Sequence, residues 1–369
     1  MKIGIITLSA SYNCGSMLQG YALKKILEKY GEVEIINFSS EASHRMYDIV
    51  PKMLKEKIHT VVTRRGLLSE LKKESKAYQD FQRINLEISG KEFFSTNLSE
   101  IAMKYDVIVT GSDQVWNVCM SDFDKAFFCG WTNRKKVAYA PSLGGHDIRE
   151  SESASEFIDL VKRFDYLSVR EEKGKKCIEE VSGKKVPMVL DPTILYGEEK
   201  WSGLVETPIV AGNYIFYYSW AYCYEELRSI VRKRSEESGL PVYVIDAHKW
   251  REYDYRNDRF NLCHAAGPLA FLNLMYYAKE CYVESFHGIL FAYMFKKNFW
   301  FLDTHQCYEQ IDTRIRELIE LIGTENRILT VYNQKLINMS IPIDYDKIND
   351  KVLEEKKTES YNYIGRALH

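Results

Sequence analysis

The feature that most constrains the fold is a repeated order of buried strand, polar turn and apolar helix. Residues 278–283 form a short apolar segment of strand length that is broken by Lys279 and Glu280, residues 284–288 form a turn, and the residues up to 295 an apolar helix. The chain opens in the same way, with a continuous apolar run at residues 2–8, a loop, and a helical pattern that ends at Gly31. Strands that are apolar throughout are covered on both faces, so these patterns predict an α/β protein.

The length of 369 residues predicts two domains, because one core of this size is uncommon. We place the boundary at residues 201–213, which carry Gly203, Pro208 and Gly212 and show little periodicity. The predicted domains are residues 1–200, with a basic helical excursion at about 45–83, and residues 213–335. A C-terminal helical segment at 336–369 is expected to pack back on the first domain.

Charge and cysteine usage narrow the function classes. The net charge of -2 argues against nucleic acid as a partner. The eight cysteines form no Cys-x-x-Cys pair, which argues against a metal site, and the absence of a signal peptide or long apolar run favours the cytoplasm. Between residues 52 and 76, eight basic and three acidic residues give 8 - 3 = +5. This stretch is either a solvated helix face or a peripheral contact with the inner surface of an anionic membrane.

Candidate functional side chains follow the predicted strands, because ligands bind at the carboxyl ends of parallel strands. After the strand at 106–110 comes a polar cluster suited to a sugar or phosphate: Gly111, Ser112, Asp113, Gln114, Trp116 and Asn117. A second cluster, Asn13, Gly15 and Ser16, precedes the first helix and is either an anion site or a plain turn.

Three further residues lie at predicted strand ends or helix starts. Arg170 follows the strand at 166–169, where its guanidinium either grips a carboxylate or phosphate or pairs with Glu171 or Glu172. His287 sits in the turn at 284–288, where it is either aimed at the ligand crevice or a helix cap. Gly267, followed by proline, starts a helix whose first N–H groups are free for a ligand.

Six motifs together resemble the polysaccharide pyruvyl transferase family, from residue 1 to about 305. They are Asn13-Cys-Gly-Ser-Met-Leu-Gln-Gly-Tyr-Ala-Leu, Val109-Thr-Gly-Ser-Asp-Gln-Val-Trp-Asn, Val137-Ala-Tyr-Ala-Pro-Ser-Leu-Gly, Leu167-Ser-Val-Arg-Glu, Val189-Leu-Asp-Pro-Thr and Ser285-Phe-His-Gly. The resemblance implies a GT-B-like fold, two Rossmann-like domains facing each other across a cleft. It also implies transfer of pyruvate from phosphoenolpyruvate, the donor substrate, onto two hydroxyls of a sugar in a bacterial surface-polysaccharide precursor, which is often lipid-diphosphate-linked. Phosphate is released and no cofactor is needed.

The resemblance also implies roles for single residues. His287 matches the acid that protonates the methylene carbon of the donor, and Arg170 matches an anion clamp. Ser285 stands where many members have arginine, which places the chain in a Ser-Phe-His-Gly branch. The donor site is therefore expected at Arg170, Gly267, Ser285, His287 and Gly288, and the acceptor site at Asn13, Gly15, Ser16, Gly111, Ser112, Asp113, Gln114, Trp116 and Asn117. Asp113 is the candidate base, with a loop cap as its alternative.

Two other functions fit the same residues. One is a GT-B-type glycosyltransferase that uses a nucleotide-sugar and binds the diphosphate at the helix start of Gly267. The other is a non-catalytic carbohydrate-binding protein in which Ser285 marks a decayed site. The acceptor sugar and the oligomeric state stay open.

Overall fold

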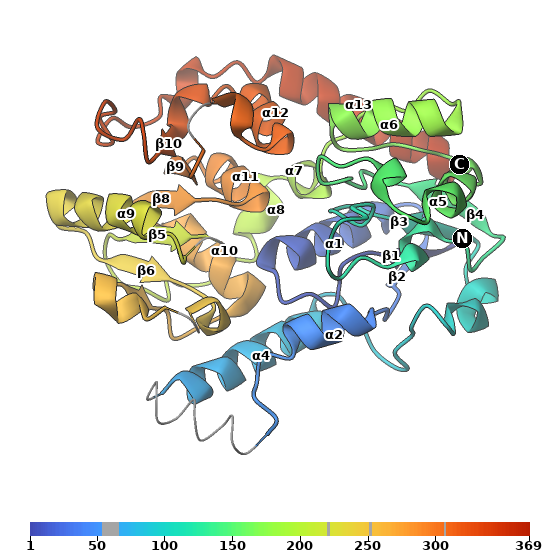
Figure 1. The fold of residues 1–369 in the computed structure, drawn as a ribbon, viewed down its shortest axis with the longest axis horizontal. Coiled ribbons are helices and arrows are strands. Elements are labelled where there is room, and N and C mark those ends of the chain that lie inside the picture. The colour runs from blue at the N-terminus through green and yellow to red at the C-terminus, as the bar shows by residue number, and fades with distance from the viewer. Residues whose placement is uncertain (54–65, 220–221, 251–252, 306–307) are drawn as a thin grey trace. The chain divides into compact units, whose positions relative to one another are not determined.

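The computed structural model describes residues 1–53, 66–219, 222–250, 253–305 and 308–369 (Figure 1). Internal contacts divide the chain into two compact units. The first unit comprises Met1–Asp48, Asp80–Tyr196 and Lys351–His369, and the second comprises Ile49–Gln79 and Gly197–Asp350. Both chain termini therefore belong to the first unit.

The first unit is built on a parallel sheet of four strands in the order β2-β1-β3-β4. The strands are β1 (Lys2–Ile6), β2 (Glu32–Ile35), β3 (Val107–Thr110) and β4 (Lys135–Ala138). All four residues of β3 are buried, as its uninterrupted apolar sequence predicts for a strand covered on both faces. The helices of this unit are α1 (Cys14–Leu27), α2 (Glu41–Tyr47), α5 (Ala154–Lys162), α6 (Glu172–Ser182), α7 (Pro192–Tyr196) and α13 (Lys351–Leu368).

The segment 166–169, which the sequence predicts to be a strand, and the apolar segment 186–190 make only isolated bridges. Val137 pairs with Tyr166, and Val169 pairs with Met188. Pro187 lies in the middle of the second segment and has no N–H to donate, which limits the ladder there. Helix α13 packs beside these segments, where Ser360 Oγ accepts a hydrogen bond of 2.9 Å from the Leu190 N–H.

The second unit holds a parallel sheet of six strands in the order β10-β9-β8-β5-β6-β7. Its strands are β5 (Ile215–Tyr218), β6 (Val242–Val244), β7 (Asn261–Leu262), β8 (Glu280–Val283), β9 (Asn298–Asp303) and β10 (Ile328–Thr330). Its helices are α8 (Glu198–Ser202), α9 (Glu225–Ser238), α10 (Gly267–Tyr277), α11 (Phe286–Met294) and α12 (Thr313–Leu321). The alternation of strand and helix confirms the sequence pattern, except that the short strands β7 and β10 were not predicted.

The basic stretch at residues 52–76 includes the start of α4 (Leu67–Ile84). Leu71, Glu74 and Tyr78 form its buried face, and three exposed basic side chains follow the opposite face: Lys72, Lys73 and Lys76. Four other basic residues of the stretch, Lys55, Lys57, Arg64 and Arg65, lie outside the described residues. Nowhere in the described chain is a helix both long and apolar enough to cross a bilayer.

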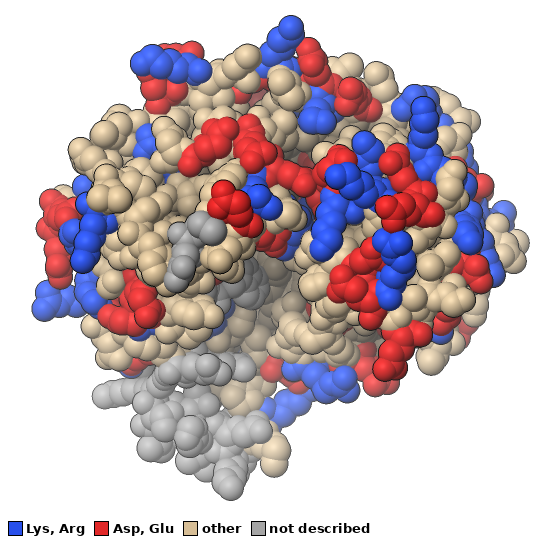
Figure 2. Space-filling model, turned by 45° about the horizontal axis from the view of Figure 1, so that its top comes forward, with Lys and Arg blue, Asp and Glu red and all other residues tan. Residues whose placement is uncertain are grey.

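Charged side chains of both signs share the surface. Figure 2 shows Lys and Arg interspersed with Asp and Glu over one face of the molecule. This distribution agrees with the near-neutral net charge of the sequence.

Candidate functional site

The carboxyl edge of the first sheet gathers the polar loop that follows β3. Asp113 is buried there, and its Oδ2 accepts a hydrogen bond of 2.6 Å from Ser16 Oγ in the first turn of α1. Its Oδ1 accepts a bond of 2.9 Å from the Gln114 N–H. The fold therefore brings Ser16, from the predicted cluster before the first helix, to Asp113, from the predicted cluster after the strand at 106–110.

Arg170 is part of a buried ion-pair network at the same edge. Its Nη1 donates a hydrogen bond of 2.6 Å to Asp191 Oδ2, and its Nη2 lies 3.9 Å from Asp113 Oδ1. The Asp191 side chain is fully buried and that of Arg170 is 4% exposed. Arg170 therefore takes part in a buried ion pair with Asp191. The neighbouring Glu171 accepts hydrogen bonds from the loop after β4, at Ser142 Oγ and Leu143 N.

Asp191 was not among the predicted site residues, although its motif was. Its Oδ1 accepts hydrogen bonds of 3.0 and 2.7 Å from the backbone N–H and the hydroxyl of Thr193, and its Oδ2 accepts one of 3.3 Å from Ser112 Oγ. These hydrogen bonds fix the orientation of the Asp191 carboxyl group. The Asp-Pro-Thr turn at the end of an apolar segment was the signal that could have identified it.

Asn13 acts as the N-cap of α1. Its Oδ1 accepts hydrogen bonds of 2.9 Å from Gly15 N and 3.3 Å from Ser16 N. These N–H groups are satisfied by the cap itself, so the geometry favours the turn interpretation over an anion site.

Trp116 supports the loop after β3 from the interior of the first unit. The indole is fully buried, stacks on Phe128 with ring centroids 5.4 Å apart, and donates a hydrogen bond of 3.2 Å to the Phe127 carbonyl. This position supports loop packing rather than stacking on a ligand. Asn117 donates a hydrogen bond of 2.8 Å to Gln114 Oε1, so these two amides are paired with each other.

Gly111 allows two loops of this edge to approach closely. Its φ is +114°, and an added Cβ would lie 2.1 Å from the carbonyl oxygen of Tyr139, just after β4. No other residue type fits this backbone without displacement.

The carboxyl edge of the second sheet carries His287. The histidine lies in the first turn of α11 and is buried, and the Ser285 hydroxyl caps the helix by accepting a bond of 3.0 Å from the Gly288 N–H. A Cβ on Gly288 would meet Ser285 Oγ at 2.9 Å, so glycine permits this tight turn. Because the first-turn residues Phe286 to Gly288 are not acidic, the positive end of the helix dipole is not offset within that turn.

Strands β5 and β6 bring further polar residues to the edge where His287 lies. The Glu284 N–H donates to the Tyr218 carbonyl at 3.1 Å, and the Ser219 hydroxyl donates to the Glu284 carboxylate. Lys249, in the loop after β6, lies with its Nζ 4.2 Å from the centre of the Tyr218 ring and 3.4 Å from Asp246 Oδ2. Lys249 thus supplies a buried cation that the sequence analysis did not single out, although its place five residues after a strand could have indicated it.

Gly267 begins α10 in the same unit, with a φ of +79°. An added Cβ would lie 3.2 Å from the Ala77 Cβ, so the helix start fits closely against α4. Ala266 precedes the helix and its methyl group cannot cap the first N–H groups.

Two parallel-sheet α/β domains, each with polar loops at the carboxyl edge, correspond to the GT-B fold. Solved structures similar to the chain include UDP-GlcNAc 2-epimerase of Methanocaldococcus jannaschii in complex with UDP-GlcNAc and UDP, at 13% identity and a TM-score of 0.53, covering 100% of this chain and 99% of that one. Another is UDP-GlcNAc 2-epimerase of Neisseria meningitidis bound to UDP-GlcNAc, at 10% identity and a TM-score of 0.55, covering 99% and 100%. At this identity the likeness shows the fold alone.

The family is shown by sequence. The model of the polysaccharide pyruvyl transferase family matches residues 13–306, and the chain belongs to this family. It is therefore a transferase of polysaccharide biosynthesis. No curated protein matches the chain by sequence.

Proposed function

We propose that the chain transfers pyruvate from phosphoenolpyruvate onto two hydroxyls of a sugar in a precursor of a bacterial exopolysaccharide or capsule. The observation that carries this proposal is the position of His287 at the positive end of α11, at the carboxyl edge of a parallel sheet. The Lys249 loop follows β6, which lies next to β5 and one strand away from β8. The acid His287, the N-terminus of α11 and the cation Lys249 together suit an enol phosphate whose phosphate group carries two negative charges.

The proposed reaction starts with proton transfer from the His287 imidazolium to the methylene carbon of the donor. C2 becomes electrophilic, and the oxygen of the first sugar hydroxyl forms a bond to it. The C2–O bond to phosphate then breaks, and the second hydroxyl oxygen adds to C2 to close the ketal. One hydroxyl proton returns to His287 and the other leaves on the phosphate, so atoms and charge balance.

The donor carboxylate and phosphate need positive potential. We assign it to the N-termini of α10 and α11 and to Lys249, whose charge is partly matched by Asp246. Arg170 can clamp an anion only if Asp191 releases part of its guanidinium. In the paired state, Arg170 instead lies with its Nη2 3.9 Å from Asp113 Oδ1 and helps to orient this carboxylate.

Thermal unfolding with millimolar phosphoenolpyruvate, set against a panel of nucleotide-sugars, tests the donor. A ligand at a hundred times its Kd stabilises the protein by about 2.7 kcal/mol. We expect stabilisation by phosphoenolpyruvate that is lost in Lys249→Met and kept in Lys233→Met, a matched change on the exposed face of α9. Stabilisation by a nucleotide-sugar alone would refute the donor assignment and favour the glycosyltransferase. Sugar binding without phosphate release from any acceptor would favour the non-catalytic protein.

We also propose that the protein works in the cytoplasm and touches the inner membrane surface through the exposed lysines of α4. Each basic residue near an anionic surface contributes about 1 kcal/mol. The contact is assigned to Lys72, Lys73 and Lys76, and the charge of Lys73 is partly neutralised by Glu70 at 2.9 Å. Sedimentation with anionic vesicles, but not with neutral ones, is expected, and equal binding of Lys72→Gln/Lys76→Gln would refute it.

A further inference from the structure

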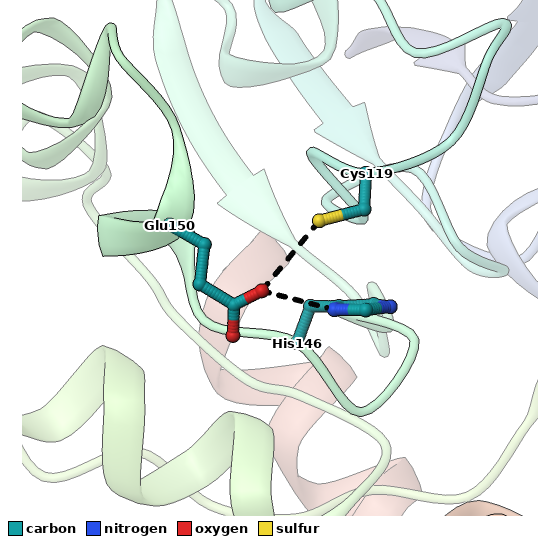
Figure 3. A group of neighbouring side chains, drawn as sticks. All are labelled: Cys119, His146 and Glu150. Atoms are coloured by element: carbon teal, nitrogen blue, oxygen red, sulfur yellow. Dashed lines mark hydrogen bonds and ion pairs between the residues drawn. The ribbon is translucent and has the colours of Figure 1, made fainter.

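Cys119, His146 and Glu150 converge beside the loops of the first sheet (Figure 3). Glu150 Oε2 lies 3.0 Å from His146 Nδ1 and 3.6 Å from Cys119 Sγ, and the three donor atoms all lie within 4.8 Å of one another. Figure 3 shows the thiol and the imidazole directed at the same carboxylate oxygen. The cluster therefore offers sulfur, nitrogen and oxygen donors at one point of the surface.

The backbone fixes two of these donors. Glu150 closes a capping box, in which its Oε1 accepts a hydrogen bond of 3.0 Å from the Asp147 N–H and Oε2 is left directed at the other two residues. On the other loop, Asn117 Oδ1 accepts a bond of 3.1 Å from the Cys119 N–H. The Glu150 carboxylate and the backbone of Cys119 are therefore each anchored by a hydrogen bond outside the cluster.

The spacing of the donors fits a tetrahedral zinc ion. Zinc binds sulfur at about 2.3 Å and nitrogen or oxygen at about 2.0 Å. Tetrahedral angles then separate sulfur from oxygen by about 3.5 Å and nitrogen from oxygen by about 3.3 Å. The structure has 3.6 Å and 3.0 Å for these two pairs, within a few tenths of an ångström of the zinc-bound values, and the sulfur and nitrogen lie within 4.8 Å of each other.

We propose that Cys119, His146 and Glu150 bind one zinc ion, with a water molecule at the fourth position. A thiolate and a carboxylate balance its two positive charges. The thiolate and imidazole select against magnesium and calcium, which prefer oxygen ligands. This site could not be recognised in the sequence. Cys119 lies 27 residues before His146, which lies 4 residues before Glu150, and only the fold brings their two segments together.

Bound zinc would connect the loop that carries Asn117 to the loop that follows β4. These loops already touch, since an added Cβ on Gly144 would lie 2.1 Å from Asn117 Nδ2. A metal bridge would hold this junction, and with it the Gln114–Asn117 pair at the sheet edge, in one arrangement.

The test is a titration of the full chain, treated with chelator under a reducing agent, first with Co²⁺ and then with Zn²⁺. We expect one ion per chain and a thiolate-to-cobalt charge-transfer band. Cys119→Ser should abolish the band, and Cys119→Ser, His146→Gln and Glu150→Gln should each weaken zinc binding by about tenfold or more. All three side chains lie on the surface, so circular dichroism should show an unchanged fold.

Matched controls are Cys223→Ser, which removes another exposed thiol, and His44→Gln, which removes a histidine paired with Glu92 at 3.0 Å. Both should bind zinc as the wild type does. Zinc binding that survives Cys119→Ser unchanged, or that follows Cys223 instead, would overturn the proposal. The absence of binding at micromolar zinc would also overturn it and leave a hydrogen-bonded cluster. Neither readout depends on pyruvyl transfer.

Discussion

Asp191→Asn tests whether the buried pair with Arg170 organises the edge of the first sheet. The substitution keeps the shape of the side chain and removes its charge. At the separation of 2.6 Å, the Coulomb attraction is about 6 kcal/mol at an effective dielectric constant of about 20. Asp113 at 3.9 Å still supplies about 4 kcal/mol at the same dielectric constant.

The net cost of Asp191→Asn is smaller than the lost attraction, because the charged carboxylate no longer has to be desolvated. Removing one partner of a buried pair typically costs about 3–5 kcal/mol. Since Asp113 compensates part of the Arg170 charge, we expect a loss of unfolding free energy at the lower end of this range, about 3 kcal/mol. For a domain of about 150–250 residues this lowers Tm by about 6–12 °C.

Calorimetry of the unfolding transition measures the effect. The matched control is Glu156→Gln, because Glu156 pairs with Lys125 at 2.8 Å on the surface, where both side chains are about half exposed. Such a pair contributes at most about 1 kcal/mol. A loss of stability in Asp191→Asn no larger than that of Glu156→Gln would refute the reasoning. The double variant with Arg170→Met should lose less than the sum of the two single variants.

Three further predictions concern the acid, a loop glycine and a surface carboxylate. His287→Gln should lower the rate of phosphate release by roughly 10²–10⁴-fold while thermal stabilisation by phosphoenolpyruvate persists, and an unchanged rate would exclude His287 as the acid. Gly111→Ala should lower the free energy of unfolding, measured by chemical denaturation, by more than about 3 kcal/mol, because its Cβ would meet a carbonyl oxygen at 2.1 Å. The control Gly212→Ala, at a position with φ +79° and open space around it, should lower it by only about 1–2 kcal/mol. The hydrogen bond from Lys24 lowers the pKa of Glu87 below 4.5, so its stabilisation is present above pH 4.5 and disappears as the pH falls through the lower folded-state value. The difference in Tm between wild type and Glu87→Gln should therefore shrink towards pH 3, and a constant difference would contradict this linkage.

The sequence by itself determined the elements that local patterns encode. Largely apolar runs specified buried strands such as β1 and β3, because a strand covered on both faces needs no polar alternation. Turn residues after these strands predicted His287 at the start of α11, and the ordered motifs predicted the family that residues 13–306 match. The strands β7 and β10 were not predicted, because segments of two and three residues are too short to show a periodic hydrophobic pattern.

Only the tertiary structure decided which side chains meet. Asp191 pairs with Arg170 from 21 residues away, and Ser16 reaches Asp113 across 97 residues. Trp116 turns inward although its loop is polar, and Lys249 reaches the Tyr218 ring because β5 and β6 are neighbours in the sheet. Contacts of this kind depend on strand order and on the direction of each loop. Those are set by the packing of the whole unit, which no local pattern of residues records.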